Sequence, residues 1–346
     1  MKLKKALLVC LLPAFVISGC GKTTTDETEN TTKQESAVEE TAQEEQETGD
    51  TETESEASGE DTDEETEASK DLFAMDTYMT LTAYGEHAQE AVDKAAERVE
   101  ALDALLSTGN EDSEIYQLNQ NGEATLSEEG GYLVERALEL YKKTEGAFDI
   151  AIYPVMQAWG FPTQDYHVPD DDTLKEKLAL ADASKVKYDK DTRKISFDQD
   201  GMEIDLGGIA KGYTSSQIMQ IYQDCGVTSG LVNLGGNVQA LGCKTDGSKW
   251  RVAIQSPDDT EEYLGILEIE DQAVITSGGY ERYFEEDGVT YHHIIDPATG
   301  YPADSGLISV TIVSDDGTLA DGLSTSLFIM GEEKAAQFWR ENSDEF

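Results

Sequence analysis

The chain has 346 residues, with 72 Asp and Glu against 25 Lys and Arg and a formal net charge of −47. Because binding to a phosphate backbone depends on basic side chains, we expect no nucleic-acid partner. Only four cysteines are present, and their spacing does not suggest a zinc site.

Residues 1–19 have the pattern of a lipoprotein signal peptide. A basic start, MKLKK, precedes an apolar run over 6–17 that is too short to cross a bilayer comfortably. The stretch VISGC resembles a bacterial lipobox, which implies cleavage before Cys20 and lipidation of that cysteine. An ordinary signal peptide with a chance cysteine is the alternative. We therefore expect an extracytoplasmic protein that is anchored to the cell membrane through Cys20.

Residues 20–70 are expected to be an acidic, disordered tether behind the lipidated cysteine. Residues 21–70 have no aromatic side chain and consist mostly of Thr, Glu, Ser and Asp. Such a segment cannot bury enough apolar surface to offset its ordering entropy. A flexible chain of this length spans roughly 40 Å, so it would extend the reach of a domain at 71–346.

The first half of that domain shows helices and a hairpin. Alternation over 75–85 predicts a strand, and apolar spacing over 89–107 predicts a helix. A second helix is expected over 131–146 and ends at Gly146. Residues 185–198 have the pattern of a hairpin around a polar turn.

The second half shows one helix, many short strands and a last helix. The stretch EIDLGGIAKGY at 203–213 suggests a strand, a glycine pair and a helix that runs from Lys211 to Cys225. The last helix is expected over 318–330, ended by Gly331. Short turns between successive strands favour antiparallel pairing, so the fold class is α+β, with largely antiparallel sheets flanked by helices. The expected strands cover 230–236, 237–242, 250–255, 264–270, 273–278, 282–295 (a pair) and 307–314.

The last helix carries a candidate metal site. Asp321 and Thr325 are four residues apart and share a helical face, with Ser324 beside them. A carboxylate and a hydroxyl are hard oxygen ligands of the kind that Mg²⁺ takes together with water and substrate phosphates. In the alternative reading, Asp321 caps the helix and Thr325 only packs.

The stretch YHHIIDPATGYP carries a candidate base. His292 and His293 occupy adjacent strand positions, so their side chains point to opposite faces and only one can face a site. A histidine there could accept the proton of a hydroxyl nucleophile. The alternative is a histidine that is hydrogen-bonded within the sheet. Cys225 and Cys243 either pair or stay free.

Eight motifs in order give a more specific reading. They are AMDTYM, GAFDI followed by WGF, DLGGIAKGY, NLGGN, WRVAI, TSGGYERYF, HHIIDPATGYP and ADGLSTSLFIMG. Together they resemble the bacterial FAD:protein FMN transferases, the ApbE-type flavin transferases, across about residues 72–340. The resemblance implies cleavage of FAD at its pyrophosphate, release of AMP and attachment of FMN to a Thr or Ser of an exported acceptor protein.

The resemblance also implies roles for particular residues. His293 falls at the position of the proposed base, and the metal, Mg²⁺, would be held by the Gly208 carbonyl, Asp321 and Thr325, with Ser324 adjacent. The flavin nucleotide would contact Met75, Ala147, Phe148, Asp149, Asp205, Lys211 and Ile295.

Four features depart from the family pattern. Gly109 stands where a tyrosine often stacks on adenine, so adenine binding is expected to be weaker or to come from elsewhere. Asp76 replaces a glycine near the nucleotide, and Ser216 stands where an aspartate is frequent. The last residue is Phe346, whereas relatives usually continue into a closing strand, so we expect an open sheet edge.

Three functions remain open at this point. The first is FMN transfer to a protein, and the second is FAD hydrolysis to FMN and AMP at the same site. The third, a non-catalytic flavin-binding lipoprotein, is disfavoured by the presence of Asp321, Thr325 and His293.

Overall fold

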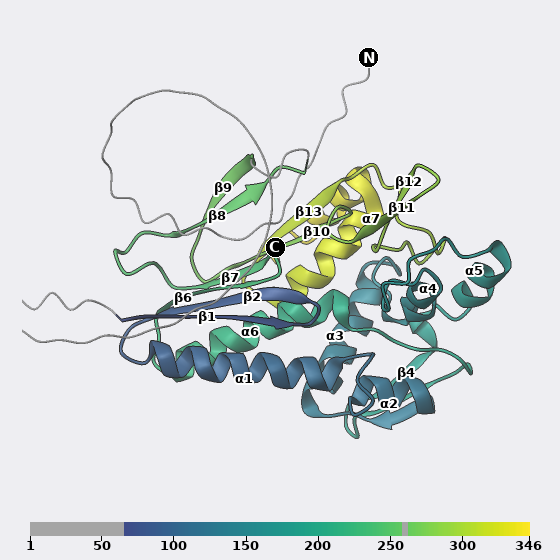
Figure 1. Ribbon diagram of the computed structural model, residues 1–346, viewed down its shortest axis with the longest axis horizontal. Coiled ribbons are helices and arrows are strands. Elements are labelled where there is room, and N and C mark those ends of the chain that lie inside the picture. The colour runs from purple at the N-terminus through teal and green to yellow at the C-terminus, as the bar shows by residue number, and fades with distance from the viewer. Residues whose placement is uncertain (1–65, 258–261) are drawn as a thin grey trace, which may run out of the picture. The chain divides into compact units, whose positions relative to one another are not determined.

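The computed structural model describes residues 66–257 and 262–346 (Figure 1). The predictions for the signal peptide, for Cys20 and for nearly all of the tether therefore lie outside the described residues. Within the described ranges, no helix is both long and apolar enough to cross a membrane.

The centre of the fold is a six-stranded antiparallel sheet with the order β1-β2-β6-β7-β10-β13. Apolar side chains alternate along its strands, as in β2, where Met79, Leu81 and Ala83 are buried between more exposed neighbours. The predicted antiparallel α+β class is confirmed. The strands are β1 (Glu67–Ala74), β2 (Thr77–Tyr84), β6 (Ser229–Leu234), β7 (Asn237–Leu241), β10 (Ala273–Gly278) and β13 (Ser309–Ser314).

Three long helices cover one face of this sheet: α1 (Ala88–Leu106), α6 (Gly207–Asp224) and α7 (Gly317–Glu341) (Figure 1). On α1, Val92, Val99 and Leu102 lie at helical spacing and are fully buried. The two-stranded ribbon of β8 (Trp250–Gln255) and β9 (Tyr263–Ile269) packs on the other face through Trp250 and Val252.

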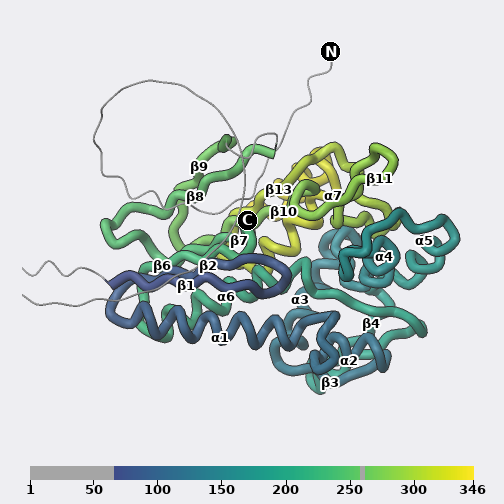
Figure 2. The backbone as a smooth tube through the Cα atoms, viewed as in Figure 1, coloured from purple at the N-terminus to yellow at the C-terminus, as the bar shows by residue number. Residues whose placement is uncertain are grey.

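A smaller part of the chain packs against α6 and α7 through α3 (Glu128–Lys143). It also holds α2 (Glu114–Asn121) and the three-stranded sheet β3-β5-β4. Figure 2 shows α4 and α5 beside the β11–β12 hairpin, although more than a hundred residues separate them in the sequence. The remaining elements are β3 (Glu123–Thr125), η1 (Ile150–Ile152), α4 (Tyr153–Ala158), α5 (Asp171–Leu178), η2 (Ala183–Lys185), β4 (Val186–Asp189), β5 (Lys194–Phe197), β11 (Tyr283–Glu286) and β12 (Val289–His292).

Several predictions near the start of elements are wrong, and α3, for example, begins at Glu128 rather than at residue 131. β1 was not predicted as a strand, and it begins at Glu67, inside the segment assigned to the tether, because pairing with β2 satisfies the backbone of residues whose side chains stay mostly exposed. α6 begins at Gly207 rather than Lys211, so the glycine pair forms the first turn of the helix. The strand expected before this pair is wrong, because residues 202–206 have no regular secondary structure. A domain cut at Asp71 would remove half of β1.

The end of the last helix is also more complex than predicted. Gly331 does interrupt α7, with φ of 78° and ψ of 167°, but helical structure resumes and runs to Glu341. A left-handed φ is easy for glycine, which explains the break at this residue. The break turns the later part of the helix away from the first part, which packs against α6.

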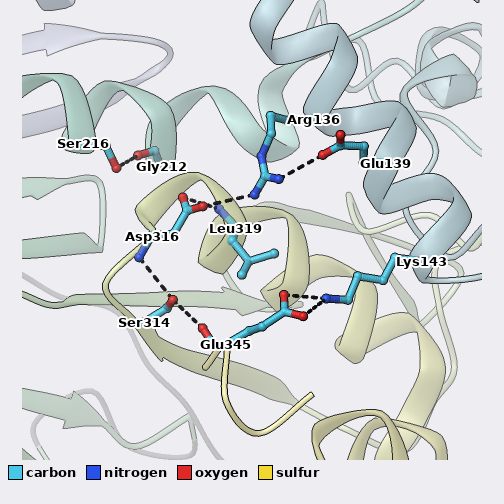
Figure 3. A network of polar contacts seen from close by, with 9 residues as sticks. All are labelled: Arg136, Glu139, Lys143, Gly212, Ser216, Ser314, Asp316, Leu319 and Glu345. Carbon is cyan, nitrogen blue, oxygen red and sulfur yellow. Dashed lines mark hydrogen bonds and ion pairs between the residues drawn. The ribbon is translucent and has the colours of Figure 1, made fainter. Parts of the chain in front are cut away.

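Polar contacts hold the residues after α7 against the body (Figure 3). Glu345 pairs with Lys143 of α3 at 2.5 Å, and its carbonyl accepts a hydrogen bond from Ser314 of β13. Asp316, the N-cap of α7, accepts from the Leu319 N–H and pairs with Arg136 at 3.1 Å. β13 forms one edge of the six-stranded sheet, and β1 forms the other. Cys225 and Cys243 are both free.

Candidate active site

One cavity of about 1370 Å³ collects the predicted site residues. It is lined by the turn between β1 and β2, the first turns of α6, one face of α7, the 147–163 segment and the 276–297 segment. Ser324 alone among the predicted domain residues does not line it. The predicted residues on its walls are Met75, Ala147, Phe148, Asp149, Asp205, Gly208, Lys211, His293, Ile295, Asp321 and Thr325.

Gly212 explains how α6 and α7 come together at this cavity. A Cβ at this residue would lie 2.1 Å from the Gly317 carbonyl oxygen and 2.6 Å from the Asp321 Cβ, so only glycine permits the contact. The Gly212 N–H donates to Asp321 Oδ2 at 2.8 Å. The close approach therefore places the α7 carboxylate directly against the first turns of α6.

The same N–H links Asp321 to Gly208. In an α-helix the N–H of residue 212 points at the carbonyl of residue 208. The Gly212 N–H has a single hydrogen and donates it to Asp321. The Gly208 carbonyl can therefore receive at most part of a bifurcated hydrogen bond from it. The Gly208 carbonyl therefore keeps acceptor capacity at the cavity wall.

Asp321 is 5% exposed and accepts one hydrogen bond at each carboxylate oxygen. Gly212 donates to Oδ2, and Asn237 Nδ2 donates to Oδ1 at 3.0 Å. Burial raises the pKa of Asp321, whereas Lys211 and these two donors lower it. Each carboxylate oxygen has about two acceptor sites, so both can still take a further ligand.

These groups fit a magnesium ion. In the described ranges, no set of three or more His, Cys, Asp and Glu side chains could hold a metal by themselves. A site of one carboxylate, one hydroxyl and one backbone carbonyl is different, because the substrate's phosphates and water supply the other ligands. Asp321, Thr325 and Gly208 would hold the ion, and the burial of an ionisable carboxyl beside Lys211 is consistent with such a partner.

His293 faces the cavity, and its neighbour His292 does not. His292 packs its ring edge against Phe328 of α7, as expected for side chains on opposite faces. The His293 Nδ1 lies 3.2 Å from the Arg282 carbonyl oxygen. A carbonyl can only accept, so Nδ1 carries the hydrogen and Nε2 is the basic nitrogen.

The surroundings of His293 keep its ring neutral. Enclosure by protein atoms, and next the Arg282 guanidinium, lower its pKa to about 3, against the opposing effect of the Arg282 carbonyl. His293 nevertheless stays partly accessible from the cavity. Nε2 is then ready to accept a proton over the whole neutral range.

The cavity is rich in carboxylates, and Lys211 and Arg282 are the basic side chains that line it among the described residues. Glu281 is surrounded by protein groups, which raises its pKa to about 7, while Lys211 lowers it. Glu281 lines the cavity and is exposed to solvent. The acidic residues on the cavity walls are Asp76, Asp103, Asp149, Asp205, Glu281 and Asp321.

The residues expected at the nucleotide are held by backbone contacts. Asp149 is buried and accepts from Ala151 N at 2.7 Å and Ala183 N at 3.1 Å; burial still raises its pKa to about 6. Asp205 accepts from Gly207 N at 2.6 Å, at the start of α6. Met75 has a left-handed φ of 49° in the β1–β2 turn, and its N–H donates to Asp103.

The sequence analysis assigned no role to four polar residues that also line the cavity, Tyr153, Ser277, Glu281 and Arg282. Tyr153 lies near Thr108, next to Gly109, and burial raises its pKa. Three of the four belong to TSGGYERYF, whose order was recognised without a role for these members. Ser277 lies on β10 and contacts α7 through Ser324 and Thr325, a contact that only the folded chain shows.

The fold and the cavity define a class of protein. Oxygen groups that fit a hard cation and a histidine that can accept a proton line the same cavity, which is large enough for a dinucleotide. This combination is typical of enzymes that transfer phosphoryl groups. The chain belongs to the ApbE family, whose model matches residues 75–346. The predicted family is thereby confirmed.

Individual relatives agree with this assignment. A protein of Treponema pallidum named FAD:protein FMN transferase is 36% identical over 296 residues, covering 80% of this chain and 82% of its own. A Klebsiella pneumoniae protein of the same name is 34% identical over 262 residues, covering 75% and 81%. The crystal structure of the ApbE protein of Thermotoga maritima has a TM-score of 0.76 at 30% identity, covering 81% and 92%. The flavin transferase ApbE from Vibrio cholerae gives 0.74 at 29% identity, with the same coverage.

Proposed function

We propose that this protein transfers FMN from FAD to a Thr or Ser hydroxyl of an exported acceptor protein and releases AMP. The observation that carries the proposal is the shared cavity of Asp321, Thr325, the Gly208 carbonyl and His293, in a chain of the ApbE family. The names of its relatives supply the two substrates, FAD and a protein.

The proposed step is an in-line displacement. The acceptor hydroxyl oxygen forms a bond to the FMN-side phosphorus, and the bond from that phosphorus to the bridging oxygen breaks. AMP leaves with the bridging oxygen, and His293 Nε2 accepts the hydroxyl proton. The negative pyrophosphate would raise the pKa of His293 above its value in the free protein, which strengthens it as a base.

Magnesium would be bound by Asp321, Thr325 and the Gly208 carbonyl. Bound there, Mg²⁺ supplies positive charge to the pyrophosphate and to the phosphate oxygens on which charge builds. Lys211 adds a cation to the same wall. The protein has a net charge of −47, so these local charges, rather than the overall field, are what would hold FAD.

We further propose that the reaction takes place outside the cytoplasm. The lipobox-like stretch at Cys20 and the acidic segment behind it support a lipid anchor with a long tether. Such a tether would let the domain reach acceptor proteins at the same membrane surface. Labelling with a radioactive fatty acid, lost in Cys20→Ser, is the expected result for a lipoprotein; equal labelling of both chains would count against it.

The transfer is tested with the protein from residue 21 onward, FAD, Mg²⁺ and an acceptor domain that carries a threonine acceptor motif. We expect the intact mass of the acceptor to rise by one FMN residue, with one AMP released for each acceptor modified. AMP and free FMN with an unchanged acceptor would identify a hydrolase instead. Bound FAD without any product would identify a flavin-binding lipoprotein.

A further inference from the structure

Three hydroxyl groups form a chain behind the candidate metal ligands. Thr325 Oγ1 lies 3.1 Å from Ser277 Oγ, and Ser277 Oγ lies 2.8 Å from Ser324 Oγ. Ser324 Oγ lies 2.8 Å from the Asp321 carbonyl oxygen, one turn earlier in α7. Thr325 and Ser277 line the cavity, whereas Ser324 is fully buried.

The end of this chain fixes its direction. The Asp321 carbonyl has no hydrogen, so Ser324 must donate to it. Each hydroxyl has one hydrogen, so Ser277 must donate to Ser324, and Thr325 must then donate to Ser277. The hydrogens therefore all run away from the cavity.

The direction determines what Thr325 presents to a ligand. A cation binds to oxygen lone pairs and is repelled by a hydroxyl hydrogen that points at it. A helical threonine often turns its hydrogen to the carbonyl four residues earlier, which for Thr325 is the Asp321 carbonyl. Here Ser324 occupies that carbonyl, and Ser277 takes the Thr325 hydrogen instead.

We propose that Ser277 and Ser324 are positioning residues that aim the Thr325 oxygen at a divalent cation. This inference rests on the proposed function, because that function supplies the cation. Asp321 is also held in place, because Gly212 and Asn237 each donate a hydrogen bond to one of its carboxylate oxygens. Both side-chain ligands would therefore meet the ion without reorientation, which lowers the cost of binding.

The test measures how FAD binding responds to Mg²⁺, by quenching of flavin fluorescence at a series of Mg²⁺ concentrations. In Ser277→Ala the Thr325 hydroxyl loses its acceptor and can turn its hydrogen into the cavity. We expect the Mg²⁺ concentration for half-maximal enhancement to rise about fivefold, the effect of one lost hydrogen bond. FAD affinity without Mg²⁺ should stay the same. A general loss of structure would instead weaken FAD binding both with and without Mg²⁺.

Two further variants sharpen the result. Ser324→Ala frees the Ser277 hydrogen to turn toward Thr325, so the Mg²⁺ response should weaken in the same direction. Ser326→Ala is the matched control, because Ser326 is equally buried on α7 but donates to the Gly322 carbonyl and does not line the cavity. It should respond to Mg²⁺ like the unsubstituted protein.

The possible failures can be told apart. A normal Mg²⁺ response in Ser277→Ala, with a clear response in the unsubstituted protein, overturns the positioning role and leaves the proposed function standing. An equal weakening in Ser326→Ala also overturns it, because the effect would then follow any lost hydroxyl on α7. No Mg²⁺ response in the unsubstituted protein overturns the proposed metal site, and this inference with it.

Discussion

Two walls of the cavity are built by different kinds of interaction. The cation wall consists of Gly208, Asp321 and Thr325, on two helices packed closely through Gly212 and fixed by hydrogen bonds. The histidine wall carries His293 just after the β11–β12 hairpin, which pairs with no other strand in the described sheets. This hairpin is held mainly by aromatic packing.

The histidine wall depends on a cluster around Trp159. The Trp159 ring lies 5.2 Å from the Tyr291 ring and 6.2 Å from the Phe284 ring, and its Nε1 donates to the Gly300 carbonyl at 2.8 Å. Phe161 lies 6.5 Å from the His293 ring. Hydrogen bonds thus fix the cation wall, whereas the histidine wall combines aromatic packing with the hydrogen bond from His293 to the Arg282 carbonyl. The two functions should therefore be separable by substitution.

The largest expected effects come from the two central side chains. Asp321→Ala removes the only carboxylate of the proposed ligand set, so Mg²⁺ should enhance neither FAD binding nor AMP release. The chain must first be checked for a normal circular dichroism spectrum, because Asp321 also binds Gly212 and Asn237. Mg²⁺-dependent AMP release at the unsubstituted rate would refute the metal assignment.

His293→Ala should separate binding from chemistry. Loss of a general base slows turnover by about 10²–10⁴-fold, while the Mg²⁺ response of FAD binding should persist. Turnover is measured as AMP released in the presence of an acceptor. His292→Gln is the control, because His292 contacts Phe328 and does not line the cavity. Full turnover in His293→Ala would show that another group takes the proton.

Gly212→Ala should damage the cation wall through backbone packing. The added methyl overlaps the Gly317 carbonyl and Asp321, so α7 must move away from α6. We expect a loss of about 1–3 kcal/mol in unfolding free energy together with a weaker Mg²⁺ response. Gly265→Ala is the matched control, since nothing lies within 4 Å of its added methyl. Equal stability of the two variants in urea would contradict the proposed role of the close approach.

Trp159→Phe should affect the histidine wall alone. The substitution keeps an aromatic ring but leaves the Gly300 carbonyl without its donor, at a cost of about 1–3 kcal/mol. AMP release should fall while the Mg²⁺ response of FAD binding stays normal. If the Mg²⁺ response falls in parallel with turnover, the two walls are not independent.

Asp149 gives an effect on stability that depends on pH. Its folded pKa, about 6, lies above the ordinary 3.8, so its contribution to stability is full below about 3.8 and is lost as the pH rises through about 6. Asp149→Asn removes this dependence. Between about pH 4 and pH 7, the unsubstituted chain should lose about 2 kcal/mol relative to the variant in denaturant titrations. A constant difference between the two chains would show that the carboxyl is already ionised.

The sequence was sufficient for the family, the fold class and most elements. Local patterns decide these, as in the alternation of β2 and the apolar spacing of α1. Element ends were less certain, because contacts from distant segments decide them. β1 forms from Glu67 onward because its residues pair with β2. α6 begins at Gly207, and its first turns pack against Asp321 of α7.

The site was only partly predictable for the same reason. Asp321 and Thr325 share a helical face, so spacing alone suggested them together. Ser277 lies more than forty residues earlier, on β10, and its contact with Thr325 depends on how α7 packs on the sheet. Glu281 and Arg282 belong to a recognised motif, but only the folded chain shows that they share the cavity with Lys211 and Asp321.

The most direct measurement is a crystal structure of the His293→Ala protein with FAD and Mn²⁺, located by its anomalous signal. We expect the ion between Asp321, Thr325 and the Gly208 carbonyl, in contact with the pyrophosphate, and the FMN-side phosphorus facing the space left by the imidazole. A manganese ion bound elsewhere in the cavity, or a pyrophosphate remote from residue 293, would contradict both the metal site and the direction of attack.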